Sequence, residues 1–175
     1  MDDVVMAWND GDHVTRAVVC GVDGSPGARV ALRTAARFAR ELGARLVVVH
    51  VVQPQPPAPG IGPTARQLAG VPVDDLLAGG KAVLDRILEE EQLHDARPRV
   101  VLGFAADRLA DVADEEAAEL IVVGSRGRGP FKAAFLGSVS TDVVAVARCP
   151  VLVVPAAAAT AGDPEGRSAA LARAV

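Results

Sequence analysis

Two glycine-bearing segments in the last third of the sequence have the spacing of a phosphate-binding loop. Gly124 and Gly127 are separated by two residues, and nine further residues lead to the pair Gly137-Ser138. Glycine lets main-chain N–H groups approach an anion closely, and a helix starting at Ser138 would add its own N–H groups and its positive dipole. The charged residues between the two segments are Arg126, Arg128 and Lys132. The pattern predicts a cradle for a polyphosphate.

Neither of two common phosphate-binding motifs fits these glycines. A Walker A loop requires Gly-Lys followed by Ser or Thr, but here Pro130 follows Gly129. The dinucleotide-binding motif Gly-x-Gly-x-x-Gly would need its third glycine where Lys132 stands. A plain turn stays open as an alternative, although it would not require Gly137-Ser138 at the next helix entry.

Asp23 is a further candidate because it follows the first apolar run of the chain. Its carboxylate could meet a sugar hydroxyl or a bound Mg²⁺, or it could cap the next helix, for which Ser25 is better placed. The loop cations either contact phosphates or are solvated. The histidines do not cluster, and we expect structural or exposed positions for His13, His50 and His94.

Apolar runs and the residues that interrupt them predict alternating strands and helices. Strands are expected at 17–22, 45–52, 99–102, 120–123 and 151–154, and helices at 26–42, 73–93, 107–118 and 138–147. Ser25, Pro26 and Gly43 have the types expected at the cap, the first position and the end of the first helix. Such alternation indicates a parallel sheet that binds ligands beyond the carboxyl ends of its strands.

Composition fits a single α/β domain with an aliphatic core. Half of the 175 residues are apolar and only 3% are aromatic. We expect the domain at 16–155, mobile tails at 1–15 and 156–175, and a long loop at 53–72 that is either a functional flap or a disordered excursion.

The charge balance and the longest apolar runs exclude two classes of partner. The net charge is −4, and an acidic chain without a basic face is not expected to bind nucleic acid. Membrane association is not expected either, because no apolar run reaches the roughly 18 residues of a transmembrane span. The first residues are acidic where a secretion signal would be basic, so a cytoplasmic location is expected.

The glycine pattern and its flanks resemble the nucleotide-binding signature of the universal stress protein family. The flanking residues that match are Ile121-Val122-Val123, Val139-Ser140 and the run from Cys149 to Val154. The opening run from Val19 to Ser25 and the pair His50-Val51 are similar to the ends of that family's first two strands. The likeness spans Ala17 to Pro155, and the glycines are those of the ATP-binding branch.

The resemblance implies a single-domain three-layer sandwich, with a Rossmann-like five-stranded parallel sheet in the order 3-2-1-4-5. Its cleft would lie between strands one and four. Val51 would meet the adenine through its main chain, Asp23 would lie near the ribose or a phosphate-bound metal, and Gly124 would shape the turn. The other implied nucleotide-binding residues are Gly127, Arg128, Gly137, Ser138, Val139 and Ser140.

The same sheet order has consequences for the cysteines and for assembly. Strands one and five would lie about 9 to 10 Å apart, beyond the roughly 7 Å limit for a disulfide, so Cys20 and Cys149 are expected as free thiols. The strand from Val151 to Val154 would be a short apolar edge that favours pairing with a second copy. The homodimer usual in the family fits this edge.

The expected function is that of a regulator in the stress response that binds ATP together with Mg²⁺. We expect it to hydrolyse ATP slowly or not at all. The loop offers cations and serines but no carboxylate or histidine that could act as a base. Two alternatives stay open, an enzyme that transfers adenylyl or phosphoryl groups from the same cleft and a dimeric stress scaffold without nucleotide. A phosphorelay receiver and a flavin carrier fit less well, because Gly103 and Pro155 replace required polar residues and Tyr is absent.

Overall fold

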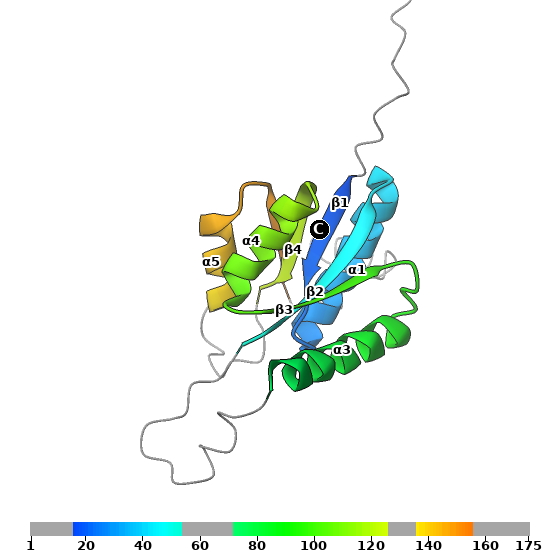
Figure 1. Ribbon diagram of the computed structural model, residues 1–175. Coiled ribbons are helices and arrows are strands. Elements are labelled where there is room, and N and C mark those ends of the chain that lie inside the picture. The colour runs from blue at the N-terminus through cyan, green and yellow to red at the C-terminus, as the bar shows by residue number, and fades with distance from the viewer. Residues whose placement is uncertain (1–15, 54–71, 126–135, 156–175) are drawn as a thin grey trace, which may run out of the picture.

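A computed structural model of the chain describes residues 16–53, 72–125 and 136–155 (Figure 1). Its strands are β1 (Ala17–Gly21), β2 (Arg45–Val52), β3 (Arg97–Leu102), β4 (Ala118–Gly124) and β5 (Val151–Val154). Its helices are α1 (Pro26–Leu42), α3 (Val73–Glu90), α4 (Ala105–Glu115) and α5 (Ser138–Val146). The predicted alternation is confirmed. The expected tails at 1–15 and 156–175, and residues 54–71 of the loop expected at 53–72, lie outside the described residues.

The five strands form one parallel sheet in the order β3-β2-β1-β4-β5, as expected. In register, Val19 of β1 lies between Val47 of β2 and Ile121 of β4. The chain winds outward in one direction from β1 through β2 to β3, and in the other through β4 to β5. The winding therefore reverses between β1 and β4, and ligands of such sheets bind at that point, beyond the carboxyl ends of the strands.

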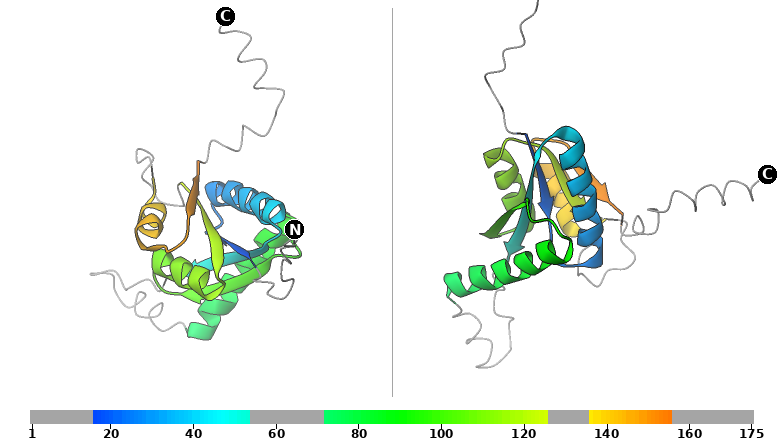
Figure 2. Two further views of the ribbon diagram at one scale, coloured as in Figure 1. Left: turned by 90° about the horizontal axis from the view of Figure 1, so that it is seen from above. Right: turned by 90° about the vertical axis from the view of Figure 1, so that its right-hand side faces the viewer.

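Helices cover both faces of the sheet and enclose two aliphatic cores (Figure 2). Helices α1 and α3 pack on one face, where β1 contributes Val18 and Cys20. Helices α4 and α5 pack on the other, where β1 contributes Ala17 and Val19. Adjacent residues of a strand point to opposite faces, so a continuous apolar run such as β1 is buried on both sides. The fold is the expected three-layer sandwich.

Helix α1 begins and ends where the sequence indicates. The hydroxyl of Ser25 accepts a hydrogen bond from the Ala28 N–H at 3.2 Å, and Gly43 ends the helix with φ 62°. Its amide and that of Ala44 bond back to carbonyls of the last turn. Glycine suits this left-handed position because it has no Cβ.

Several helix ends differ from the prediction by one to three residues. Helix α5 ends at Val146 instead of residue 147, and α4 begins at Ala105 instead of residue 107. The larger differences are that α3 ends at Glu90 instead of residue 93 and α4 at Glu115 instead of residue 118. The reason is that Gln92 and Ala117 adopt left-handed conformations, with φ 54° and 49°, and turn the chain toward the next strand. Strands β3 and β4 start earlier than expected as a result, and β4 also extends to Gly124.

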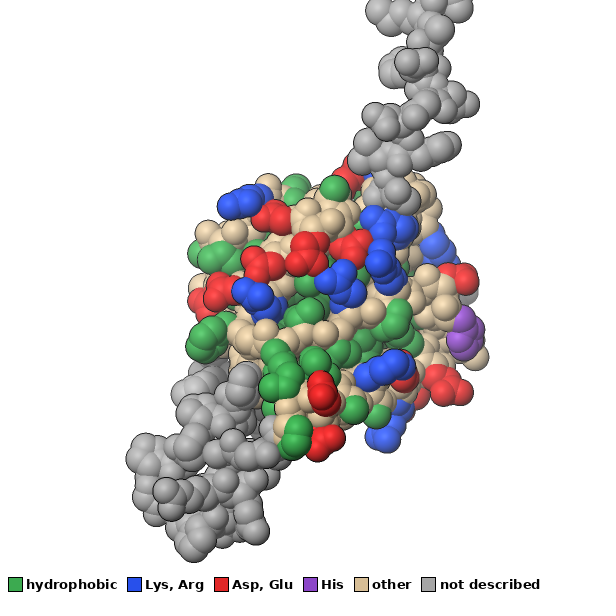
Figure 3. Space-filling model, in the orientation of Figure 1, with side chains coloured by type: hydrophobic (Ala, Val, Ile, Leu, Met, Phe, Trp, Pro, Cys, Tyr) green, Lys and Arg blue, Asp and Glu red, His purple; other side chains and the backbone are tan. Residues whose placement is uncertain are grey.

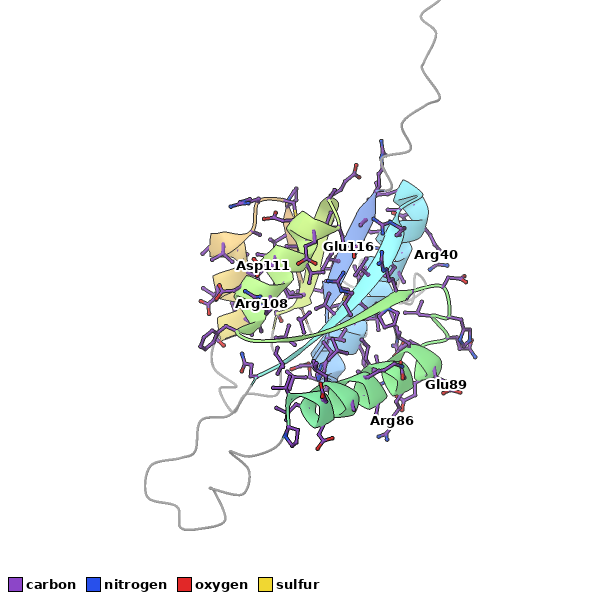
Figure 4. All side chains as sticks on the ribbon, in the orientation of Figure 1. Arg40, Arg86, Glu89, Arg108, Asp111 and Glu116 are labelled. Atoms are coloured by element: carbon purple, nitrogen blue, oxygen red, sulfur yellow. The ribbon has the colours of Figure 1, made fainter. Side chains whose placement is uncertain are left out.

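A buried carboxylate joins β2, β3 and the end of α4. Glu116 contacts Arg45 at 2.9 Å, Arg97 at 3.4 Å and Arg99 at 2.8 Å, and its side chain is only 6% exposed. Glu116 lies beside these strands in Figure 4. Over the same face, acidic and basic side chains alternate instead of forming separate patches (Figure 3). Among the described helices, none has the length and apolar character to cross a bilayer.

Candidate functional site

Asp23 lies in the turn that follows β1, on the side of the sheet where all five parallel strands end. We call this side the carboxyl edge. Its Oδ1 accepts a hydrogen bond from the Ser25 N–H at 2.9 Å, and Gly24 adopts φ 79° within the turn. The Ser25 hydroxyl caps α1, so Asp23 is not the helix cap. The half-buried Asp23 carboxylate thus shapes the turn and remains at the edge where a ligand is expected.

The penultimate residue of β2, Val51, also reaches this edge. It lies opposite Val101 of β3, and the last carbonyl of β2, that of Val52, accepts a hydrogen bond from the Gly103 N–H at 3.1 Å. The neighbouring His50 has its Nδ1 2.8 Å from the Val22 carbonyl oxygen, which is a structural role as expected.

Gly124, at the end of β4, lies against the first turn of α1. A Cβ on Gly124 would come within 3.0 Å of the Gly27 carbonyl carbon and oxygen, and within 3.2 Å of the Ala28 nitrogen. Real side chains rarely approach main chain so closely. The close packing of β4 on α1 therefore requires glycine at position 124, a requirement that has no signal in the sequence, in addition to its expected place at the turn.

Main-chain hydrogen bonds join the ends of β4 and β5 to the start of α5. The Ser125 N–H donates to the Val154 carbonyl at 2.8 Å, and the Gly137 N–H donates to the Ser125 carbonyl at 2.7 Å. The Ser140 hydroxyl donates to the Gly137 carbonyl at 2.9 Å and lies 3.4 Å from that of Ser125. These contacts fix where α5 begins.

The same network distinguishes Ser140 from its neighbours. Ser140 is 1% exposed, and its hydroxyl is engaged in supporting the segment, whereas Ser138 and Val139 are exposed on the first turn. Ser125 is also buried, at 6%, and was not among the predicted site residues. Its position directly after Gly124 was the only signal for it in the sequence.

The N-terminus of α5 has no side-chain cap. Gly137 is the N-cap residue in an extended conformation, with φ −77° and ψ 164°, and its carbonyl accepts the first helical hydrogen bond from Thr141. The first N–H groups of a helix have no partners within it and attract anions together with the helix dipole. This geometry suits a phosphate group.

Not every predicted site residue can be placed. Gly127 and Arg128, with the other loop cations Arg126 and Lys132, lie outside the described residues. The structure places Asp23, Val51 and Gly124 at or just after the carboxyl ends of β1, β2 and β4, and Gly137, Ser138, Val139 and Ser140 at the start of α5. In the described ranges there is no group of three His, Cys, Asp or Glu side chains that could hold a metal ion. Both cysteines, Cys20 and Cys149, are free thiols.

A parallel sheet with reversed winding between β1 and β4, covered on both faces, defines a Rossmann-like α/β protein with an anion-attracting helix N-terminus at its carboxyl edge. The model of the universal stress protein family matches residues 15–155. The chain belongs to the universal stress protein family.

Curated relatives, two of similar length and one about twice as long, support this membership. The chain is 33% identical over 144 residues to a universal stress protein of Thermus aquaticus, covering 79% of this chain and 98% of the relative. It is 32% identical over 146 residues to universal stress protein Rv1636 of Mycobacterium tuberculosis, covering 79% and 95%. Against universal stress protein Rv2623 of the same organism, also 32% identical, it spans 46% of the relative's length.

Solved structures of relatives include complexes with adenine nucleotides. A universal stress protein in complex with cAMP superposes with a TM-score of 0.59 at 26% identity, covering 81% of this chain and 98% of that one. The universal stress protein from Archaeoglobus fulgidus in complex with dAMP gives a TM-score of 0.56 at 28% identity, covering 80% and 97%.

Proposed function

We propose that this protein binds an adenine nucleotide, ATP with Mg²⁺, at the carboxyl edge of its sheet, and that occupancy regulates a partner in the cytoplasmic stress response. The observation that carries the proposal is the Ser125–Gly137 hydrogen bond, which holds the uncapped start of α5 beside the end of β4. Relatives in complex with cAMP and dAMP support the adenine nucleotide.

Each part of the nucleotide has candidate contacts. The main chain of Val51 meets the base, and Asp23 lies near the ribose or a phosphate-bound Mg²⁺, for which a carboxylate oxygen is a suitable ligand. The phosphates lie against the glycine segments, and the residues assigned to them are Gly124, Gly127, Arg128, Gly137, Ser138, Val139 and Ser140. Because Ser140 is buried and its hydroxyl donates to the Gly137 carbonyl, we assign it to positioning the start of α5 and not to direct contact with a phosphate.

The proposed role is binding with slow hydrolysis or none. Efficient hydrolysis needs a group that orients or deprotonates the attacking water near the terminal phosphate. Among residues 136–139, at the start of α5, the exposed side chains are those of Leu136, Ser138 and Val139, none of which is a carboxylate or a histidine, and Asp23 accepts a hydrogen bond within its own turn. Turnover at about 1 s⁻¹ or faster would instead support an adenylyl- or phosphoryl-transferring enzyme.

Assembly through β5 is a separate part of the proposal. Strand β5 is an edge strand of four residues, and Val151, Leu152 and Val153 are only partly buried. An unpaired apolar edge is a template for pairing with another strand. We propose a homodimer through Val151–Val154, which sedimentation of the full chain can test.

The deciding experiment measures nucleotide in the purified full chain and titrates it with ATP and Mg²⁺, alongside Gly137→Ala. The φ and ψ of Gly137 are accessible to alanine, so the variant should fold, while its Cβ narrows the approach to the first turn of α5. We expect the wild type to bind ATP and the variant to bind it at least roughly tenfold more weakly, a loss of about 1.4 kcal/mol. Gly79→Ala is the control, because a Cβ there meets no atom within 4 Å. Failure of the wild type to carry or bind nucleotide would favour the scaffold alternative.

A further inference from the structure

The side chain of Phe104 is the most exposed large apolar side chain in the described ranges, and 74% of this residue is accessible to solvent. It is also the N-cap residue of α4, and no side chain caps that helix. Ser, Thr, Asp and Asn are preferred at an N-cap over apolar residues, because their side-chain oxygens accept hydrogen bonds from the free N–H groups of the first turn. Phe104 therefore lacks both the burial and the capping contact that would explain its residue type structurally.

The structure places Phe104 beside the end of β2. Val52 of β2 lies opposite Leu102 of β3, and the Gly103 N–H donates to the Val52 carbonyl at 3.1 Å. Gly103 adopts φ 138°, a conformation that favours glycine, and so turns the chain immediately before Phe104. Phe104 is two residues beyond Leu102, so it follows the carboxyl end of β3, the strand paired with β2, at the same end of the sheet as Val51, the residue assigned to the base.

Aromatic side chains are scarce enough for this location to be informative. The described residues contain two phenylalanines and no Trp or Tyr, and the other phenylalanine, Phe38, lies on α1 with the guanidinium of Arg37 5.5 Å from its ring centre. Leu136 and Val139 are exposed at the start of α5, but they offer no π face. A purine base is a flat π system, and bases bind favourably when they stack on an aromatic side chain.

We propose that Phe104 stacks on the purine base and gives the site its preference for a nucleotide over a bare polyphosphate. The inference rests on the proposed function, because it requires a nucleotide at the carboxyl edge. The base covers the exposed ring, while the phosphates bind at the start of α5. Phe104 thus determines specificity without contributing to the phosphate cradle.

A series of substitutions at Phe104 tests the inference, with Kd for ATP and Mg²⁺ measured on the full chain. We expect Phe104→Trp to bind at least as tightly as the wild type, Phe104→Leu to bind roughly tenfold more weakly, and Phe104→Asp to bind more weakly still. Asp at this extended N-cap position can cap α4, so Phe104→Asp should not lower the urea midpoint. Weakened binding then cannot be attributed to unfolding.

Inorganic tripolyphosphate is the second probe, and Leu42→Ala is the control variant. Leu42 is exposed at the C-terminal end of α1, at the opposite edge of the sheet. We expect the substitutions at Phe104 to leave the Kd of tripolyphosphate within about twofold and Leu42→Ala to leave both Kd values unchanged.

Three outcomes overturn the inference. If ATP binds equally to the wild type, Phe104→Leu and Phe104→Asp, Phe104 does not contact the base, and the proposed function still stands. If Phe104→Asp abolishes dimerisation on sedimentation but leaves the affinity for ATP unchanged, the Phe104 ring forms a contact between two copies of the chain. If the wild type binds no ATP at all, the proposed function fails together with the inference.

Discussion

The main-chain amide of Gly137 donates a 2.7 Å hydrogen bond to the carbonyl oxygen of Ser125, across eleven intervening residues of sequence. Since the Ser125 amide donates to Val154 at the same time, the ends of β4 and β5 and the start of α5 form one hydrogen-bonded unit. The N-terminus of α5 is therefore positioned before any ligand arrives, and preorganisation of this kind lowers the cost of binding.

Ser140→Ala should weaken this unit. The buried hydroxyl donates to the Gly137 carbonyl, and we expect its removal to cost about 1 kcal/mol of unfolding free energy and to reduce affinity for ATP. Thr141→Ala is a matched control, because its exposed hydroxyl bonds to the same carbonyl at 3.0 Å and water can replace it. Urea denaturation and ATP titration measure both effects. Equal losses in the two variants would contradict the supporting role of Ser140.

Two adjacent glycines in α3 should respond oppositely to alanine. A Cβ on Gly80 would lie 2.7 Å from Val52 Cγ2 and 2.8 Å from Val100 Cγ1, whereas one on Gly79 meets nothing within 4 Å. Gly79→Ala should stabilise the protein by up to about 1 kcal/mol through helix propensity.

Gly80→Ala should destabilise the protein by about 1 to 3 kcal/mol, because α3 must move away from β2 and β3. Thermal and urea unfolding of the two single variants give the comparison. A loss of stability in Gly79→Ala, or none in Gly80→Ala, would show that α3 does not pack on the sheet as described.

Most of the fold could be predicted because every strand contains an aliphatic run, such as Val100 to Leu102 in β3 and Leu120 to Val123 in β4. The run from Ala17 to Gly21 is buried on both faces, and no other element fits it. The ends of α3 and α4 could not be predicted, because Gln92 and Ala117 occupy left-handed positions where glycine would have been the signal. Strand order followed from the family resemblance, since residue patterns alone do not fix which strands are neighbours.

The candidate site was predictable in part for a similar reason. The spacing that leads to Gly137-Ser138 is a local pattern, and the structure places these residues at the start of α5. The Ser125 to Val154 hydrogen bond joins segments far apart in sequence and has no local signal. Phe104 lay in a stretch predicted to be a connection, and its 74% exposure could be seen only in three dimensions.

Glu116→Gln should lower stability more than Glu115→Gln. Glu116 is buried and contacts three arginines, whereas Glu115 contacts only Arg99 among the ion pairs of the described residues and is 58% exposed. Because the arginines are partly solvated, we expect a loss of about 1 to 3 kcal/mol for Glu116→Gln and below about 1 kcal/mol for Glu115→Gln. Urea midpoints of the two variants measure this difference. Similar midpoints would show that Glu116 contributes no more to stability than Glu115.

Acid should weaken the contact between α1 and the end of α3. Glu91 accepts hydrogen bonds from the Arg33 guanidinium at 2.6 and 3.0 Å, and this contact holds the pKa of Glu91 below its ordinary value. A carboxyl whose pKa is lower in the folded state contributes stability that is present above the unfolded pKa, about 4.3, and is lost as the pH falls toward the folded value.

The measurement is the free energy of unfolding as a function of pH between about 6 and 3, in the wild type and in Glu91→Gln. The wild type should lose more stability on acidification than the variant. The reason is that, as the pH falls, Glu91 is protonated in the unfolded state before it is protonated in the folded state. Glu89→Gln removes an exposed carboxylate from the same helix and is the control (Figure 4). Concentrated salt should reduce the difference, because Arg33 is 64% exposed and its charge is screened. Parallel pH curves for the wild type and Glu91→Gln would show that the Arg33 contact does not persist in solution.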